Sequence, residues 1–182
     1  MEEEIDEMWE RIKNDVLKNI VDLDTRNALV ALDRFVDRSG VSATSRSDAL
    51  GLRAEIRFDA GDYASARADL LLAHNLASPS YLKYVHELSL GSVCRAEHNR
   101  SEAVKWYRSA LQTCLDAKGV SGGSALKQFV SLLGEDISAE DLALCRAVIA
   151  RSWVVLGLTG EAATHDLAAA IATIREGETK PR

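Results

Sequence analysis

The chain has 182 residues, of which 28 are acidic, 22 are basic and only two are proline. Its length fits one domain with a core of its own, and a hydrophobic content of 47% argues against disorder. The net charge of −6 disfavours nucleic-acid binding, which usually needs a basic face. The 26 alanines and 23 leucines, together with the scarcity of proline, predict an all-α protein.

The negative charge is concentrated near the start of the chain. Residues 1–40 hold 11 acidic and 6 basic side chains, so five of the six excess negative charges lie there. We therefore expect a basic protein partner and neither nucleic acid nor an anionic membrane. The three cysteines show no metal-binding spacing, and the chain has no signal-like start and no apolar span of ~20 residues. These features predict a cytoplasmic protein.

The first half of the chain predicts four helices. In the first, apolar residues recur every three or four positions and so form one helical face. Asp24 is expected to cap a second helix at about 25–38. Ser42 or Thr44 would cap a third at about 43–60, which Gly61 ends, and Asp62 a fourth that ends near residue 77. The apolar face of the first helix consists of Ile5, Met8, Trp9, Ile12, Val16 and Ile20.

The second half predicts five more helices and no strand. Ser78-Pro79 breaks the chain before a fifth helix, because the residue before proline is forced out of helical conformation. Ser138 has capping-box spacing and should begin the eighth. The expected helices span about 80–97, 101–117, 125–133, 138–156 and 161–175. We expect one domain over 1–176, an insertion with an extra helix at about 116–137, and a frayed tail at 177–182.

Two of the expected helix pairs share a sequence pattern that recurs after 37 residues. In each, an alanine of the second helix is followed by a large residue four positions later and by another alanine. The pattern resembles the tetratricopeptide repeat (TPR), which implies a stack of antiparallel helical hairpins, an α-solenoid. Gly91 would then be a packing glycine, whereas Gly51 has no role in the pattern. One copy has Gly61, Tyr63, Ala66, Leu70 and Ala73, and the other has Leu90-Gly91, Asn99, Ala103, Trp106-Tyr107 and Ala110-Leu111.

The resemblance implies a concave groove that binds a protein or peptide and is lined by the first helix of each pair. The candidates in one helix are mainly acidic and include one aromatic residue, and those in the next helix are mostly apolar. A basic or amphipathic segment of a partner would suit these two sets. The alternative is that Glu55 and Asp59 are only a solvated helix face. The candidates are Asp48, Gly51, Glu55, Phe58 and Asp59 in one helix, and Val85, Leu88, Ser92 and Arg95 in the next.

The sequence contains no recognisable catalytic, cofactor or metal motif. The four histidines are scattered, and no phosphate-loop, dinucleotide or nucleophile-elbow pattern occurs. Arg95, Arg100, Lys105 and Arg108 form a basic cluster that we interpret as solvated surface. We therefore expect no cofactor, no metal and no enzymatic activity, although an all-α enzyme with a site built across helices is a second hypothesis.

The favoured hypothesis is a binding protein that acts by occupying its partner. An immunity protein (antitoxin) that blocks a basic toxin fits the acidic charge. A TPR-type secretion chaperone and a scaffold subunit of a larger assembly are the alternatives. The sequence leaves the oligomeric state open.

Overall fold

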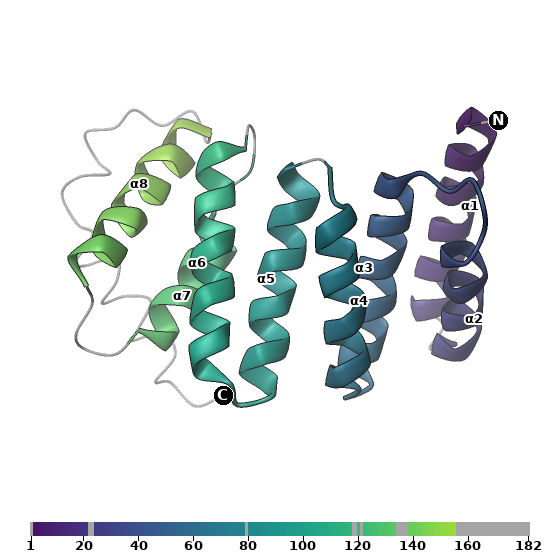
Figure 1. Cartoon of the computed structure of the whole chain (residues 1–182), viewed down its shortest axis with the longest axis horizontal. Coiled ribbons are helices and arrows are strands. Elements are labelled where there is room, and N and C mark those ends of the chain that lie inside the picture. The colour runs from purple at the N-terminus through teal and green to yellow at the C-terminus, as the bar shows by residue number, and fades with distance from the viewer. Residues whose placement is uncertain are drawn as a thin grey trace.

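The computed structural model describes residues 2–21, 24–78, 80–117, 120, 122–133 and 138–155. Within these ranges the chain forms eight α-helices and no strand, which confirms the all-α prediction (Figure 1). The ninth expected helix, at about 161–175, and the tail at 177–182 lie outside the described residues. The helices are α1 (Glu2–Val21), α2 (Thr25–Val36), α3 (Ala43–Asp59), α4 (Tyr63–Leu76), α5 (Ser80–Ala96), α6 (Arg100–Asp116), α7 (Gly123–Leu132) and α8 (Ala139–Val155).

The helices begin where side chains can accept hydrogen bonds from their first backbone N–H groups. Asp24 accepts from the N–H of Asn27, at 3.3 Å, and Ser42, rather than Thr44, caps α3. Asp62 and Ser138 cap α4 and α8 in the same way. These four caps confirm the predicted helix starts. The start of α6 was predicted one residue late, because Asn99 is its cap.

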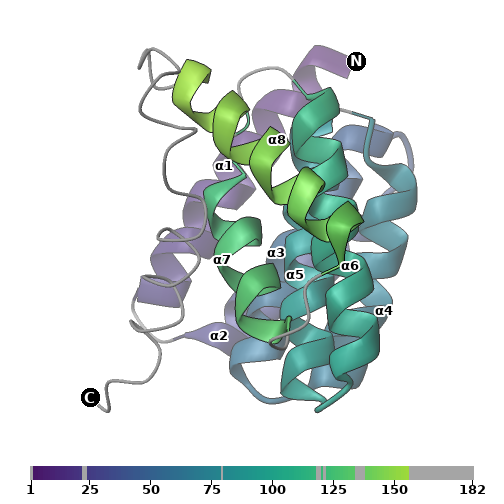
Figure 2. The ribbon, with the colours of Figure 1, turned by 90° about the vertical axis from the view of Figure 1, so that its left-hand side faces the viewer.

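Successive helices pack as antiparallel pairs, α1 with α2, α3 with α4 and α5 with α6, and the pairs stack side by side (Figure 1). Within the stack, α3 contacts both α1 and α5, so the first helices of successive pairs lie next to one another. Figure 2 shows α7 and α8 covering the end of the stack, with α8 crossing α6 and α7 obliquely. The structure is therefore a solenoid-like stack, as predicted.

Two glycines let helices approach closely. A Cβ atom at Gly91 would lie 2.5 Å from Cε1 of Tyr107, whose side chain is fully buried. This confirms the packing role predicted for Gly91. A Cβ atom at Gly51 would lie 2.7 Å from Cε1 of His86, so Gly51 also has a packing role, between α3 and α5. Contacts this short do not occur around real Cβ atoms, and a larger residue would displace the facing ring.

Charged groups tie neighbouring helices together. Asp69 of α4 is almost fully buried and accepts two hydrogen bonds from Arg53 and one from Arg57, both on α3. Arg53 also binds Asp33 of α2, at 2.7 Å. At the other end of the stack, Arg108 of α6 makes a two-pronged contact with Asp141 of α8. Such bidentate pairs fix the relative position of two helices as well as their contact.

None of the helices within the described ranges combines the length and the apolar character that crossing a bilayer requires.

Candidate functional site

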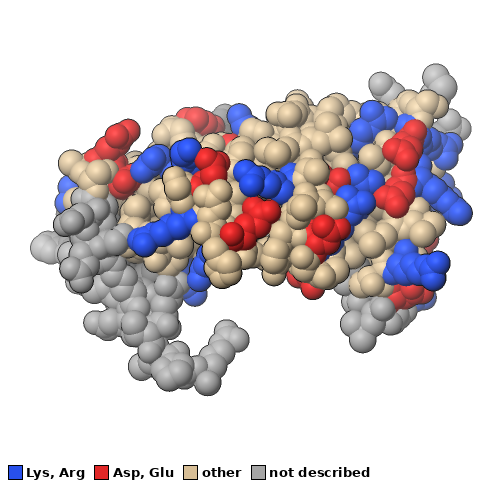
Figure 3. All heavy atoms as spheres, turned by 60° about the horizontal axis from the view of Figure 1, so that its bottom comes forward, with Lys and Arg blue, Asp and Glu red and all other residues tan. Residues whose placement is uncertain are grey.

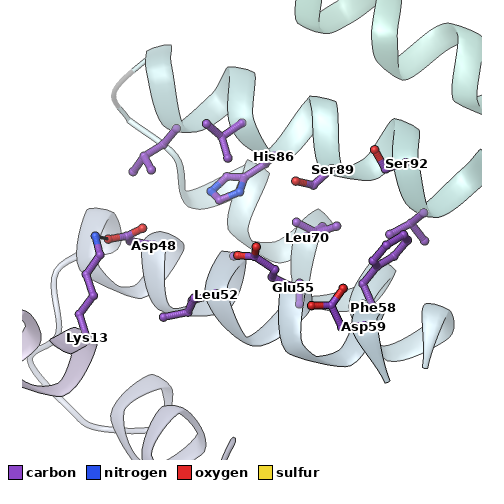
Figure 4. A pocket seen from close by; sticks show the side chains of 15 residues that line it. Lys13, Asp48, Leu52, Glu55, Phe58, Asp59, Leu70, His86, Ser89 and Ser92 are labelled. Carbon is purple, nitrogen blue, oxygen red and sulfur yellow. Dashed lines mark hydrogen bonds and ion pairs between the residues drawn. The ribbon is translucent and has the colours of Figure 1, made fainter. Parts of the chain in front are cut away.

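A groove runs between α3 and α5, with one residue of α1 at its end, and we call it the α3–α5 groove. Its volume is about 510 Å³, and most of its lining surface is apolar. The close-up in Figure 4 shows side chains of α3 and α5 facing each other across it. Its lining consists of Lys13, Asp48, Gly51, Leu52, Ala54, Glu55, Phe58, Asp59, Leu70, Leu82, Val85, His86, Ser89, Ser92 and Val93.

Seven of the nine residues predicted to face a partner line this groove: Asp48, Gly51, Glu55, Phe58, Asp59, Val85 and Ser92. Leu88 and Arg95 lie outside it. Leu88 packs against the core shared by α5 to α8, and Arg95 donates a hydrogen bond to Gln128 of α7. A helix turns about 100° per residue, so both sit some 60–80° around α5 from Val85. They therefore face the end of the stack.

Asp48 is in the groove but its charge is already neutralised. Its Oδ2 atom accepts hydrogen bonds from Lys13 Nζ at 2.6 Å and from Trp9 Nε1 at 3.1 Å. The hydrogen bond to Asp48 raises the pKa of Lys13, so this amine stays protonated. The Lys13–Asp48 pair thus fastens α1 to α3 and closes one end of the groove.

Glu55 and Asp59 are the unpaired charges of the groove. Both are exposed, and within the described part of the chain neither makes an ion pair or a side-chain hydrogen bond. They also line a neighbouring pocket of about 290 Å³ on the other side of α3, so they stand on a ridge open to both sides. Lys13, Asp48, Glu55 and Asp59 together give the groove a net charge of −2.

Elsewhere on the surface, charges of the two signs are interspersed. On the face drawn in Figure 3, acidic and basic side chains lie among one another along the whole stack. The predicted basic cluster of α5 and α6 is not merely solvated, because Arg100 donates to the carbonyl of Leu132 and Arg108 binds Asp141. These contacts hold α7 and α8 in place.

His86 is a buried polar residue that lines the groove. It points from α5 towards α3, in the space that Asp48 and Glu55 flank (Figure 4), and is only 2% exposed. Its Nε2 atom lies 2.9 Å from Ser47 Oγ. The hydroxyl of Ser47 donates to the carbonyl of Ala73, at 2.8 Å, so Nε2 must carry the hydrogen that joins it to Ser47. Nδ1 is then a bare acceptor.

Two further observations characterise this histidine. Burial lowers the pKa of His86 to about 4, and the nearby His74 acts in the same direction, so the ring is neutral at pH 7. Nδ1 has no hydrogen-bond partner in the structure. Ser47 is fully buried and its proton is committed to a carbonyl, so the Ser47–His86 contact is a tie between α3, α4 and α5. A catalytic nucleophile and its base need access to a substrate, and the buried Ser47 hydroxyl lacks that access.

Sequence reasoning missed eight of the fifteen groove residues, and the two that matter most for the polar contacts are Lys13 and His86. Lys13 belongs to a different helix pair, and nothing local links it to Asp48, which is 35 positions away. The unexplained Gly51 was the available signal for His86, because a glycine inside a helix indicates close approach of another group. No set of three His, Cys, Asp or Glu side chains converges as metal ligands would within the described ranges.

Comparison with known proteins leaves the groove as the main guide to function. No family model matches the chain. No curated protein and no solved structure matches it significantly.

Proposed function

We propose that this protein is a non-enzymatic binding module, similar to TPR proteins, whose α3–α5 groove holds a basic, amphipathic segment of a partner protein. The observation that carries the proposal is the pairing of an apolar groove with two unpaired carboxylates, Glu55 and Asp59. Apolar side chains of the segment would fill the space between Phe58 and Val85, and its lysines or arginines would face the carboxylates. Complementary charge of this kind favours association and fixes orientation.

The first candidate for the biological role is an immunity protein that blocks a basic toxin. Such a protein needs only to cover its partner, which suits a stack of helices with a groove on one side. A secretion chaperone or a scaffold subunit would use the same groove differently. Affinity capture from the source cells separates them, because an immunity protein should retain one stoichiometric basic protein. Many unrelated clients would point to the chaperone, and further copies of this chain alone would point to the scaffold.

The groove itself is tested by reversing its charge. Glu55→Lys combined with Asp59→Lys should weaken the captured partner's affinity roughly tenfold or more, because two favourable charge pairs become repulsive. Helicity should not change, since neither carboxylate holds another residue. The measurement is the dissociation constant by calorimetry.

The matched control reverses two exposed acids outside the groove, Asp15→Lys and Asp37→Lys, which alters the net charge equally. Equal weakening by both double variants would show a general charge effect. Full affinity in the groove variant would move the interface away from α3.

A further inference from the structure

The carboxylates of Glu55 and Asp59 stand between two apolar hollows. They line the α3–α5 groove and also the pocket of about 290 Å³ on the other side of α3, which we call the α1–α3 pocket. Leu52 lines both as well, so one stripe of α3 divides the two hollows (Figure 4). Positions 52, 55 and 59 share this stripe because residues three and four apart lie on one helical face. A partner that reaches the carboxylates therefore has apolar space on each side.

Each hollow is bordered by a large apolar side chain that solvent reaches. Leu17 of α1, in the α1–α3 pocket, is 43% exposed, and Val85 of α5, in the α3–α5 groove, is 44% exposed. Glu55 and Asp59 between them are exposed too. Apolar side chains left exposed around concave space, next to charged groups, mark an interaction surface. This surface extends from α1 across α3 to α5.

The separation of the two hollows matches the width of an α-helix. Because α1 and α5 each contact α3, the hollows on either side of α3 are about 8–10 Å apart, the usual distance between packed helices. A helix with its side chains is about 10–12 Å wide. Laid along α3, it can direct three adjacent stripes of side chains to the carboxylates and to both hollows. An extended strand cannot, since its side chains alternate between two opposite faces.

We propose that the partner segment is an α-helix with a central basic stripe and an apolar stripe on each side of it. This inference rests on the proposed function and adds the α1–α3 pocket to the binding surface. Lysine or arginine at positions i and i+4 of the segment would face Glu55 and Asp59, which are also four residues apart. Apolar residues at i+1 and i+3 lie about 100° to one side and about 60° to the other, and would enter the two hollows.

Two isomeric synthetic peptides test this arrangement. Both repeat seven residues with lysine at positions 1 and 5. The two-sided peptide has leucine at positions 2 and 4 and glutamine elsewhere, and the one-sided peptide exchanges the residues at positions 2 and 7. Composition and charge are equal, but only the first peptide has leucines on both sides of its lysines. It should bind the full chain roughly fivefold more tightly or better by fluorescence anisotropy, because it fills both hollows.

A substitution in the α1–α3 pocket provides the matching test on the protein. Leu17→Ser should weaken binding of the two-sided peptide about fivefold. It should leave the one-sided peptide unaffected, because that peptide has leucines for one hollow and would use the larger α3–α5 groove. Leu72→Ser is the control, since Leu72 is 48% exposed on α4 and lines neither hollow. It should change the affinity of neither peptide, and circular dichroism should show both variants folded.

The outcomes separate this inference from the proposed function. Equal binding of the two isomers, or two-sided binding that Leu17→Ser leaves unchanged, overturns the two-sided partner. The proposed function still stands in that case if Glu55→Lys with Asp59→Lys weakens both peptides. If neither peptide binds, or if charge reversal has no effect, the proposed function fails as well. A dimer of the free chain that Leu17→Ser dissociates, seen by analytical ultracentrifugation, would assign this surface to a second copy and overturn the inference.

Discussion

The α3–α4 and α5–α6 pairs are both antiparallel, but different contacts hold their helices together. In α3–α4, Arg53 and Arg57 donate hydrogen bonds to the buried Asp69. In α5–α6, the ring of Tyr107 covers Gly91, and the buried Glu87 accepts a hydrogen bond from Ser109 at 2.7 Å. The first pair thus commits Arg53 and Arg57 to ion pairs with Asp69. Because those arginines face α4, the carboxylates on the opposite side of α3 remain free for a partner.

The largest effect is expected at Asp69, because the ion pairs that join α3 to α4 depend on its carboxylate. Asp69→Asn should destabilise the protein by about 3 kcal/mol, because two partly buried guanidinium groups lose the charge that compensates them. Urea unfolding followed by circular dichroism measures the loss. Asp33→Asn is the control, since Asp33 is half exposed and should cost about 0.5 kcal/mol. Similar losses at the two sites would refute a special role for the buried carboxylate.

The stability of the α5–α6 pair should depend on close packing instead of on ion pairs. Gly91→Ala should cost about 2 kcal/mol, because the added methyl group meets the enclosed ring of Tyr107 at 2.5 Å and outweighs the gain in helix propensity. High salt should leave this loss unchanged, whereas it should reduce the effect of Asp33→Asn. The measurement is again urea unfolding. Gly51→Ala is the comparison variant, and it should cost less because His86 borders an open groove.

The smallest expected effect is a pH dependence that originates where the two pairs meet. The folded-state pKa of His86, about 4, lies below its ordinary 6.5, so the unfolded chain binds more protons between these values. Stability is therefore complete above pH 6.5 and falls as the pH decreases. The contribution lost between pH 8 and pH 5.5 should be about 1 kcal/mol.

His86→Gln provides the control for this titration, because Asp48, Glu87 and His74 also surround the ring. The variant should lack the contribution of His86 while keeping those of its neighbours. Identical pH profiles of stability for the two proteins would show that His86 does not titrate in this window.

The sequence was sufficient to predict the eight helices of the described residues and their order. Capping residues such as Asp24 and Ser138 act within one turn, so local pattern reveals them. The groove was predicted in part, because positions 48, 55 and 59 of one helix share a face by periodicity alone. Lys13 and His86 were missed because their roles depend on how separate pairs pack, and Leu88 and Arg95 were misplaced because the direction of α7 was unknown.

The order in which the helices stack also affects how the protein unfolds. Each helix contacts mainly its neighbours along the chain, so the ends of the stack can open while the middle stays folded. The α3–α5 groove extends from Lys13 of α1 to Val93 of α5. A segment bound along the groove would link helix pairs that otherwise unfold one after another. Binding would then make unfolding more cooperative, and amide exchange in α1 and α5 would slow together.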